Sequence, residues 1–265
     1  MKIAFFKTNL STIQKICLSG LFIALITILQ KVIAVNNLAF APFVRVSFGG
    51  PALIIFASIL LGPIYGGFIG MASDLLGYLV FDLRVFPLYP QITAIYTLLG
   101  IVSYFVFSFV FSIKNKKVLS FIEIASLAAI WLAVSLYVIL SSEITLFSSS
   151  YPVDLLTKIL VPSLLGLMFL GVILFSHLYK PKDDNPYMSP MHICFASFIC
   201  DLFIIVIFGS IMKAWAFGFS TFLAIILCQA MVMFINVALD TLFISAFQRF
   251  TKKYFVSDYG RKEEN

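Results

Sequence analysis

The chain has 265 residues, of which 62% are hydrophobic and only 11% are charged. Soluble domains carry roughly 25% charged residues, so the composition excludes a soluble domain and indicates a polytopic membrane protein. The sequence shows too little apolar–polar alternation for a membrane barrel, so we expect an all-α bundle in one domain, residues 1–265. The formal net charge of +6 is examined below against membrane topology and does not indicate nucleic acid.

The apolar runs predict about eight transmembrane helices. Their expected bounds are 16–35, 48–61, 63–81, 91–112, 118–140, 155–178, 191–212 and 217–247. A cleavable signal peptide is the alternative for the first run, because Ala39-Phe40-Ala41 follows it. The run is too long for a typical signal and Pro42 comes next, which favours a spanning helix.

A stretch from Ser47 to Phe81 combines apolar sequence with regularly spaced glycines. Pro63 cannot donate a backbone hydrogen bond, so Gly62-Pro63 predicts a turn between the second and third spans. Gly66, Gly70, Asp74 and Gly77 then recur at helical spacing and share one face. Small residues allow another backbone to approach closely, and a carboxyl on that face points away from lipid.

The distribution of basic residues predicts the orientation. With a cytoplasmic N-terminus, 13 of the 18 Lys and Arg residues lie on the inside. An even number of spans then places both termini in the cytoplasm, including a basic tail at 249–265. The outer segments are 36–47, 82–90, 141–154 and 213–216.

Two of these outer segments combine aromatic and basic side chains. The segment before the second span contains Phe43, Arg45 and Phe48, and the segment 82–90 contains Arg84, Phe86 and Tyr89. Aromatic faces with a positive charge suit a flat anionic ligand. An interfacial aromatic belt is the alternative interpretation.

Residues 47–93 read SFGGPALIIFASILLGPIYGGFIGMASDLLGYLVF and then, from Phe86, FPLYPQIT. This pattern resembles the substrate-binding (S) component of energy-coupling factor (ECF) vitamin transporters, of the folate type. A family FPGF turn is replaced here by Phe86-Pro87-Leu88-Tyr89. The last two spans, with Ile235-Asn236-Val237, are similar to the family's last two helices, although the usual Arg is absent and Gln229 is nearest.

The resemblance implies a core of six helices, 1–113 and 191–248, with an extra helical hairpin at 114–190. In the alternative alignment, 118–180 supplies the family's helices five and six and two helices are appended. The resemblance further implies that Gly20 and Ala24, with the stripe of Gly66 and Gly70, dock on a transmembrane scaffold (T) subunit. Two cytoplasmic ATPases would drive transport at the plasma membrane.

Residue chemistry predicts the ligand contacts, and the resemblance supplies their location. Arg45 and Arg84 would pair with an anionic group, while Phe43, Phe86 and Tyr89 would enclose a flat ring under a lid at 36–48. The other expected ligand contacts are Phe48, Gln91, Thr93, Gln229 and Asn236. Asp74 is expected either to contact the ligand or to serve helix packing.

No nucleotide-binding motif is present, so we expect a binding subunit that is not an enzyme and has no cofactor or metal of its own. Its partners would be a folate-like vitamin, the scaffold, the two ATPases and the lipid bilayer. Riboflavin, a B6 vitamer and niacin are alternative ligands. Alternative functions are a stand-alone secondary carrier and a membrane enzyme that uses Asp201, Asp240 or the interfacial histidines His177 and His192. The motifs of aspartyl proteolysis are not evident around either aspartate.

Overall fold

The computed structural model describes residues 10–31, 49–82, 88–113, 115–146, 149–178, 190–218 and 222–255. It confirms an all-α bundle, and within these residues seven helices are long and apolar enough to cross a membrane. An eighth, Gly50–Leu61, is shorter. Five of the predicted ligand contacts lie outside the described residues: Phe43, Arg45, Phe48, Arg84 and Phe86.

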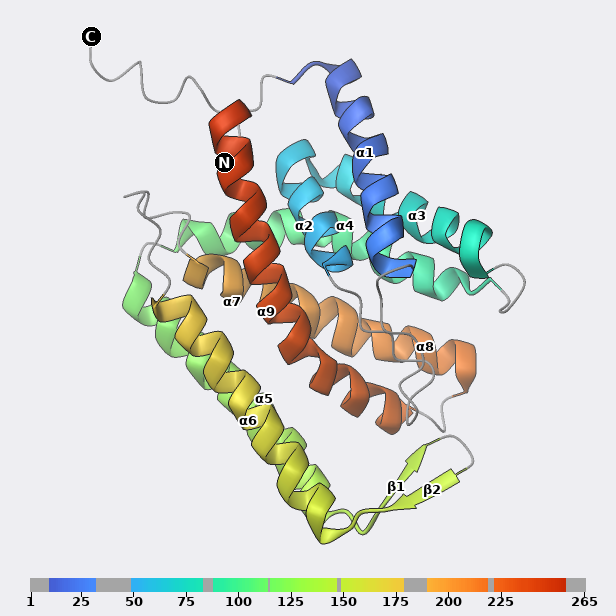
Figure 1. Cartoon of the computed structure of the whole chain (residues 1–265), viewed down its shortest axis with the longest axis vertical. Coiled ribbons are helices and arrows are strands. Elements are labelled where there is room, and N and C mark those ends of the chain that lie inside the picture. Colours follow the sequence, from blue (N-terminus) through green and yellow to red (C-terminus); the bar gives the residue numbers. More distant parts are fainter. Residues whose placement is uncertain are drawn as a thin grey trace.

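The helices of the bundle are shown in Figure 1. In chain order they are α1 (Thr12–Lys31), α2 (Gly50–Leu61), α3 (Pro63–Gly77) with the π-helical turn η1 (Tyr78–Asp82), α4 (Pro90–Ser112), α5 (Lys116–Leu140), α6 (Leu155–Leu178), α7 (Pro190–Cys200), the π-helix η3 (Asp201–Phe208), α8 (Gly209–Phe217) and α9 (Phe222–Phe255). Because α7, η3 and α8 run without a break, they form one span. The prediction that residues 213–216 form an outer segment is therefore wrong, because these residues are part of α8.

The predicted break at Gly62-Pro63 is confirmed. Gly62 has φ 101° and Pro63 is the first residue of α3, so α2 and α3 are joined by a single non-helical residue. The positive φ is accessible to glycine without strain, and proline suits the first helical position. Gly62 N–H donates to Ser58 O at 2.9 Å and closes α2.

The helices α2, α3 and α4 pack through their backbones. A Cβ placed on Gly66 would lie 2.6 Å from the carbonyl oxygen of Gly100, and a Cβ on Gly70 would overlap Tyr96 O. Ser58 Oγ donates to Gly100 O at 2.5 Å at the same crossing. Gly66 and Gly70 thus allow the backbone of α4 to approach α3 closely within this chain, as small residues generally do between membrane helices.

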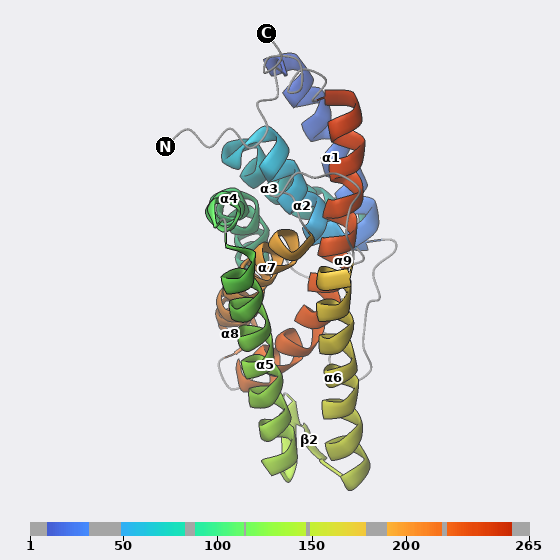
Figure 2. The ribbon, with the colours of Figure 1, turned by 90° about the vertical axis from the view of Figure 1, so that its left-hand side faces the viewer.

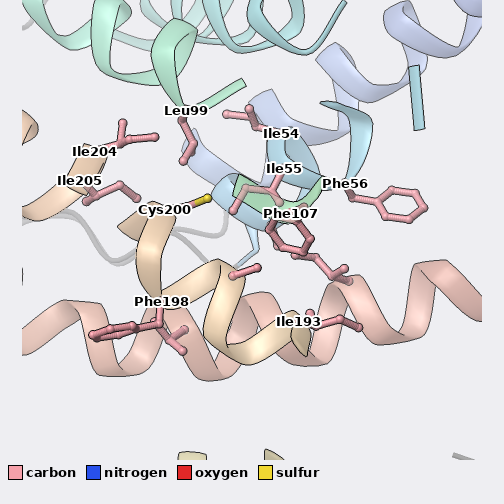
Figure 3. Close-up of a cluster of buried hydrophobic side chains, with 14 of the residues drawn as sticks. Ile54, Ile55, Phe56, Leu99, Phe107, Ile193, Phe198, Cys200, Ile204 and Ile205 are labelled. Carbon is pink, nitrogen blue, oxygen red and sulfur yellow. The ribbon is translucent and has the colours of Figure 1, made fainter. Parts of the chain in front are cut away.

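The core is centred on α2, which is buried along its whole length. Figure 3 shows Ile54 and Phe56 of α2 near Leu99 and Phe107 of α4 and Cys200 of α7. With 12 residues α2 is about 18 Å long. It is therefore shorter than the hydrocarbon core, which is about 30 Å thick.

The helices α5 and α6 form a hairpin at one side of the bundle, where they pack against α7 and α9 (Figures 1 and 2). They are joined through the antiparallel strands β1 (Glu143–Leu146) and β2 (Ser149–Pro152). Trp131 Nε1 donates to Pro162 O at 3.1 Å and the indole stacks on Phe169, which holds the two helices together. These helices correspond to the predicted hairpin at 114–190.

The start of α1 and the end of α9 lie at the same end of the bundle, and the strands β1 and β2 lie at the other (Figure 1). This arrangement agrees with an even number of crossings. The side of the membrane to which each end belongs stays a prediction from the charge distribution.

Candidate functional site

A small cavity of about 40 Å³ lies where α2, α4, η3, α8 and α9 meet. Pro51, in the first turn of α2, and Ile92, Ile95 and Tyr96, near the start of α4, form one wall. Ile205 of η3, Lys213 of α8, and Gln229 and Asn236 of α9 form the rest. Such a volume accommodates a few water molecules.

Two predicted ligand contacts, Gln229 and Asn236, meet in this cavity. They are seven residues apart on α9, so they share one helix face. Their exposed fractions are only 4% and 6%. Gln229 Nε2 and Asn236 Oδ1 have no hydrogen-bond partner in the structure. Because a buried unpaired polar atom costs about 1–3 kcal/mol, these atoms indicate a place for water or a ligand.

Lys213 and Tyr96 also line the cavity, and the sequence analysis did not identify either as a site residue. Lys213 is half-buried. Charged residues in membrane spans generally face the protein interior, but this rule was not applied to Lys213 because the sequence analysis placed it in an outer segment and not in the helix GSIMKAWAF. The cavity therefore combines one ammonium group with two side-chain amides.

Asp74 and Thr93, both predicted as ligand contacts, are brought together elsewhere. Thr93 Oγ1 donates to Asp74 Oδ2 at 2.6 Å, and both side chains are buried between α3 and α4. Thr93 also lines an open, apolar groove of about 370 Å³ with Met71, Leu75 and Leu98. The contact favours the packing role for Asp74 over contact with a ligand.

Two further predicted contacts lie at the start of α4, next to the cavity wall. Tyr89 is half-buried and precedes the helix. Gln91 is the neighbour of the cavity residue Ile92, and its buried Oε1 has no hydrogen-bond partner. Gln91 is thus near the cavity in sequence but does not line it.

The glycines predicted to dock on a partner fall into two groups. Gly20 and Ala24 are exposed on α1, and a Cβ on Gly20 would have no neighbour within 4 Å. Gly66 and Gly70 are buried against α2 and α4. The expectation that Gly66 and Gly70 contact a partner is therefore corrected, because neighbouring helices of the same chain already occupy this face.

The carboxyls of Asp201 and Asp240 lie close enough to interact electrostatically. Their exposed fractions are 0% and 1%. A further buried carboxyl, Glu123 of α5, was missed in the sequence analysis and lies near Cys194, Ser176 and His177. The buried acids of this bundle therefore lie between helices and do not face lipid.

The two histidines lie at the ends of spans, as predicted for interfacial residues, and both contact neighbouring helices: His177, in the last turn of α6, is half-buried and His192, in the first turn of α7, is buried. His177 Nε2 lies 2.6 Å from Ser120 Oγ and joins α6 to α5. His192 is almost fully buried, stacks on Phe111 and lies 3.1 Å from Ile113 O through Nε2. Across the described parts of the chain, no group of three or more His, Cys, Asp and Glu side chains is arranged to hold a metal ion.

The fold thus defines a polytopic α-helical membrane protein with a small polar cavity inside its bundle. No protein-family model matches the chain, and neither a curated protein nor a solved structure matches it.

Proposed function

We propose that the chain is the vitamin-binding S component of an ECF-type importer, with folate or a related pteridine as its ligand. It would lie in the plasma membrane with both termini in the cytoplasm. A transmembrane scaffold subunit would bind it, and two cytoplasmic ATPases would supply the energy. The chain itself would act as a binding subunit and not as an enzyme.

One observation carries this proposal: the polar cavity is built from the two segments that carry the resemblance. Pro51 and Ile92 belong to residues 47–93, and Ile205, Gln229 and Asn236 belong to the last two predicted spans. Lys213 belongs to the segment that was predicted to join those two spans. Pro51 follows the outer segment 36–47 and Ile92 follows the outer segment 82–90. A ligand that entered between these segments would reach the cavity directly.

The chemistry of the cavity favours an anionic or strongly polar ligand. The ammonium group of Lys213 can pair with a carboxylate, in addition to the predicted contacts of Arg45 and Arg84. The amides of Gln229 and Asn236 can donate and accept at the polar edge of a ring. A vitamin is far larger than 40 Å³, so binding requires the surrounding helices to move apart.

The test is to purify the protein from cells grown in rich medium and to identify the bound small molecule by mass spectrometry. We expect a reduced folate or another pteridine, present in an amount close to that of the protein. Recovery of riboflavin, a B6 vitamer or niacin would keep the binding function and reject the folate assignment. If titration with each of these vitamins gives no binding heat, the S-component proposal fails.

A stand-alone secondary carrier is the second candidate, because Asp201 and Asp240 lie buried within the spans, as ion-pathway carboxyls do. Transport into proteoliposomes that contain this chain alone distinguishes the two functions. A carrier accumulates the vitamin when an ion gradient is imposed. An S component accumulates it only when the scaffold and ATPases are also present and ATP is supplied.

A further inference from the structure

The two buried aspartates occupy a defined place in the bundle. Asp201 begins the π-helix η3, and Asp240 lies on α9 against the start of α2, where its carboxyl accepts a hydrogen bond from the backbone N–H of Ala52. Cys200 of the buried cluster in Figure 3 lies near both carboxyls. π-Helical segments are rare and occur frequently at functional sites.

Around the two aspartates, several buried acceptor oxygens have no hydrogen-bond donor. Both oxygens of Asp201, Oδ2 of Asp240 and Oδ1 of Asn236 are buried without a hydrogen-bond partner. Asn236 lies one helical turn before Asp240 on the same face of α9. Acceptors that converge in a low-dielectric interior without donors are strongly unfavourable unless a cation or a proton satisfies them.

The same oxygens lie directly next to the cavity. Asp240 is one turn beyond Asn236, and Asp201 is one turn before Ile205, and both Asn236 and Ile205 are cavity residues. Ala52, which contacts Asp240, follows the cavity residue Pro51. The carboxyl pair thus lies about one helical turn away from the cavity. Asn236 lies next to the carboxyl pair and also lines the cavity.

The charge balance leaves room for one positive ion. The N-terminus of α2 contributes roughly half a positive charge, and the ammonium group of Lys213 lies at the neighbouring cavity, so the charge of two carboxylates is offset in part and less than one full charge remains. A divalent ion such as Ca²⁺ takes about 6–8 oxygen ligands, more than the four unpartnered side-chain oxygens found here. A small monovalent cation needs less charge compensation and prefers the same oxygen ligands.

We propose that Asp201, Asp240 and Asn236 form a binding site for one small monovalent cation of the Na⁺ type, next to the polar cavity. Ion binding would link η3 to α9 and so stabilise the part of the cavity that Ile205 and Asn236 line. Because Asn236 lines the cavity as well, the bound ion would orient its amide toward whatever occupies the cavity. This site does not depend on which ligand the cavity takes.

The test is thermal unfolding of the full chain in detergent, in NaCl and in choline chloride at equal ionic strength and fixed pH. A ligand that binds only the folded state raises the midpoint of unfolding in a concentration-dependent manner. We expect NaCl to raise the midpoint in a saturating way, and Asp201→Asn and Asp240→Asn each to abolish this rise. The matched control is Asp74→Asn, a buried aspartate that already has the Thr93 hydroxyl as a donor and should keep the full rise.

A milder variant keeps the proposal testable if either aspartate variant fails to fold. Asn236→Ala removes one neutral oxygen and should raise the Na⁺ concentration of the half-maximal rise by about tenfold, the equivalent of 1.4 kcal/mol. The proposal is overturned if NaCl and choline chloride give the same midpoint. It is also overturned if lowering the pH in choline chloride stabilises the protein while Na⁺ has no effect, since the pair then binds a proton.

Discussion

Thr93 on α4 donates a hydrogen bond to Asp74 on α3, with 2.6 Å between the two oxygens. The contact lies in the same helix pair as the close approach of Gly70 to Tyr96. The close packing of these backbones brings two short polar side chains within bonding distance. A carboxyl inside a membrane span is therefore accommodated by a neighbouring helix of the same chain.

We expect Thr93→Val to destabilise the protein by about 1–3 kcal/mol, because the buried carboxyl loses a donor while the side-chain volume is kept. Thermal unfolding in detergent measures this loss. The control is Thr97→Val on the same helix, whose hydroxyl donates only to the carbonyl of Thr93 within α4. Equal destabilisation by the two variants would contradict a special role for the contact between helices.

The crossing of α3 and α4 should not tolerate a methyl group. In Gly100→Ala the new Cβ would overlap the carbonyl of Gly66, and backbone cannot move aside as a side chain can. We expect a loss of at least about 1–3 kcal/mol, the usual cost of overpacking. Gly171→Ala on α6 has nothing within 4 Å and serves as the control. Unchanged unfolding of Gly100→Ala would show that this approach is looser than described.

The proposed docking face on α1 can be tested without disturbing the fold. Gly20→Leu places a bulky side chain on an exposed position and should leave thermal unfolding unchanged. If Gly20 and Ala24 meet a scaffold helix, the variant should lose co-purification with scaffold and ATPases. The matched control is Gly171→Leu, also exposed on a lipid-accessible helix. Intact assembly of Gly20→Leu would exclude this docking face.

Lys213 should determine the affinity for an anionic ligand. Charge-assisted hydrogen bonds contribute about 1.5–3 kcal/mol, so Lys213→Met should weaken folate binding roughly 10- to 150-fold in calorimetric titration. Lys158→Met, at the start of α6 and away from the cavity, should bind as the wild type does. Unchanged affinity in Lys213→Met would place the anionic group of the ligand elsewhere.

A pH-dependent helix cap is expected at the start of α6. The side chain and backbone N–H of Thr157 donate to Asp154, which lowers the pKa of this exposed carboxyl from its ordinary 3.8. The stabilisation is therefore complete above pH 3.8 and is lost as the pH falls through the lowered pKa. Hydrogen exchange at Thr157, corrected for the intrinsic pH dependence, should show protection that decreases on acidification.

The control for this cap is Asp154→Asn, because an amide oxygen still accepts the cap hydrogen bonds but does not titrate. Its protection at Thr157 should stay constant over the same pH range. The same acid-induced loss in both proteins would show that the carboxyl does not control the cap.

The spans were largely predictable, because hydropathy and proline positions act locally along the chain. Gly62-Pro63 indicated the turn, and the predicted bounds of the fifth and sixth spans agree closely with α5 and α6. The extent of α8 was not predictable in the same way. Lys213 resembles a loop residue in the sequence, and only the continuous helix through η3 places it beside the cavity.

Contacts between distant helices could not be derived from a single sequence. The stripe of Gly66 and Gly70 indicated a close neighbour, but nothing local shows that this neighbour is α4 and not another subunit. Asp201 and Asp240 were considered together only as a pair for aspartyl proteolysis, and otherwise each was expected to be hydrogen-bonded inside the bundle or to lie near an interface. Their mutual approach follows from the packing of η3 against α9, which depends on the whole bundle.

The single-residue turn at Gly62 has a mechanical consequence. Because only one residue joins α2 to α3, a displacement of Pro51 at the start of α2 is expected to move α3 as well. The backbone of α3 is in turn packed directly against that of α4 at Gly66 and Gly100. These three helices therefore behave as a stiff frame. Widening of the cavity is therefore expected to require a displacement of α8 and α9, which form its opposite side, relative to these three helices.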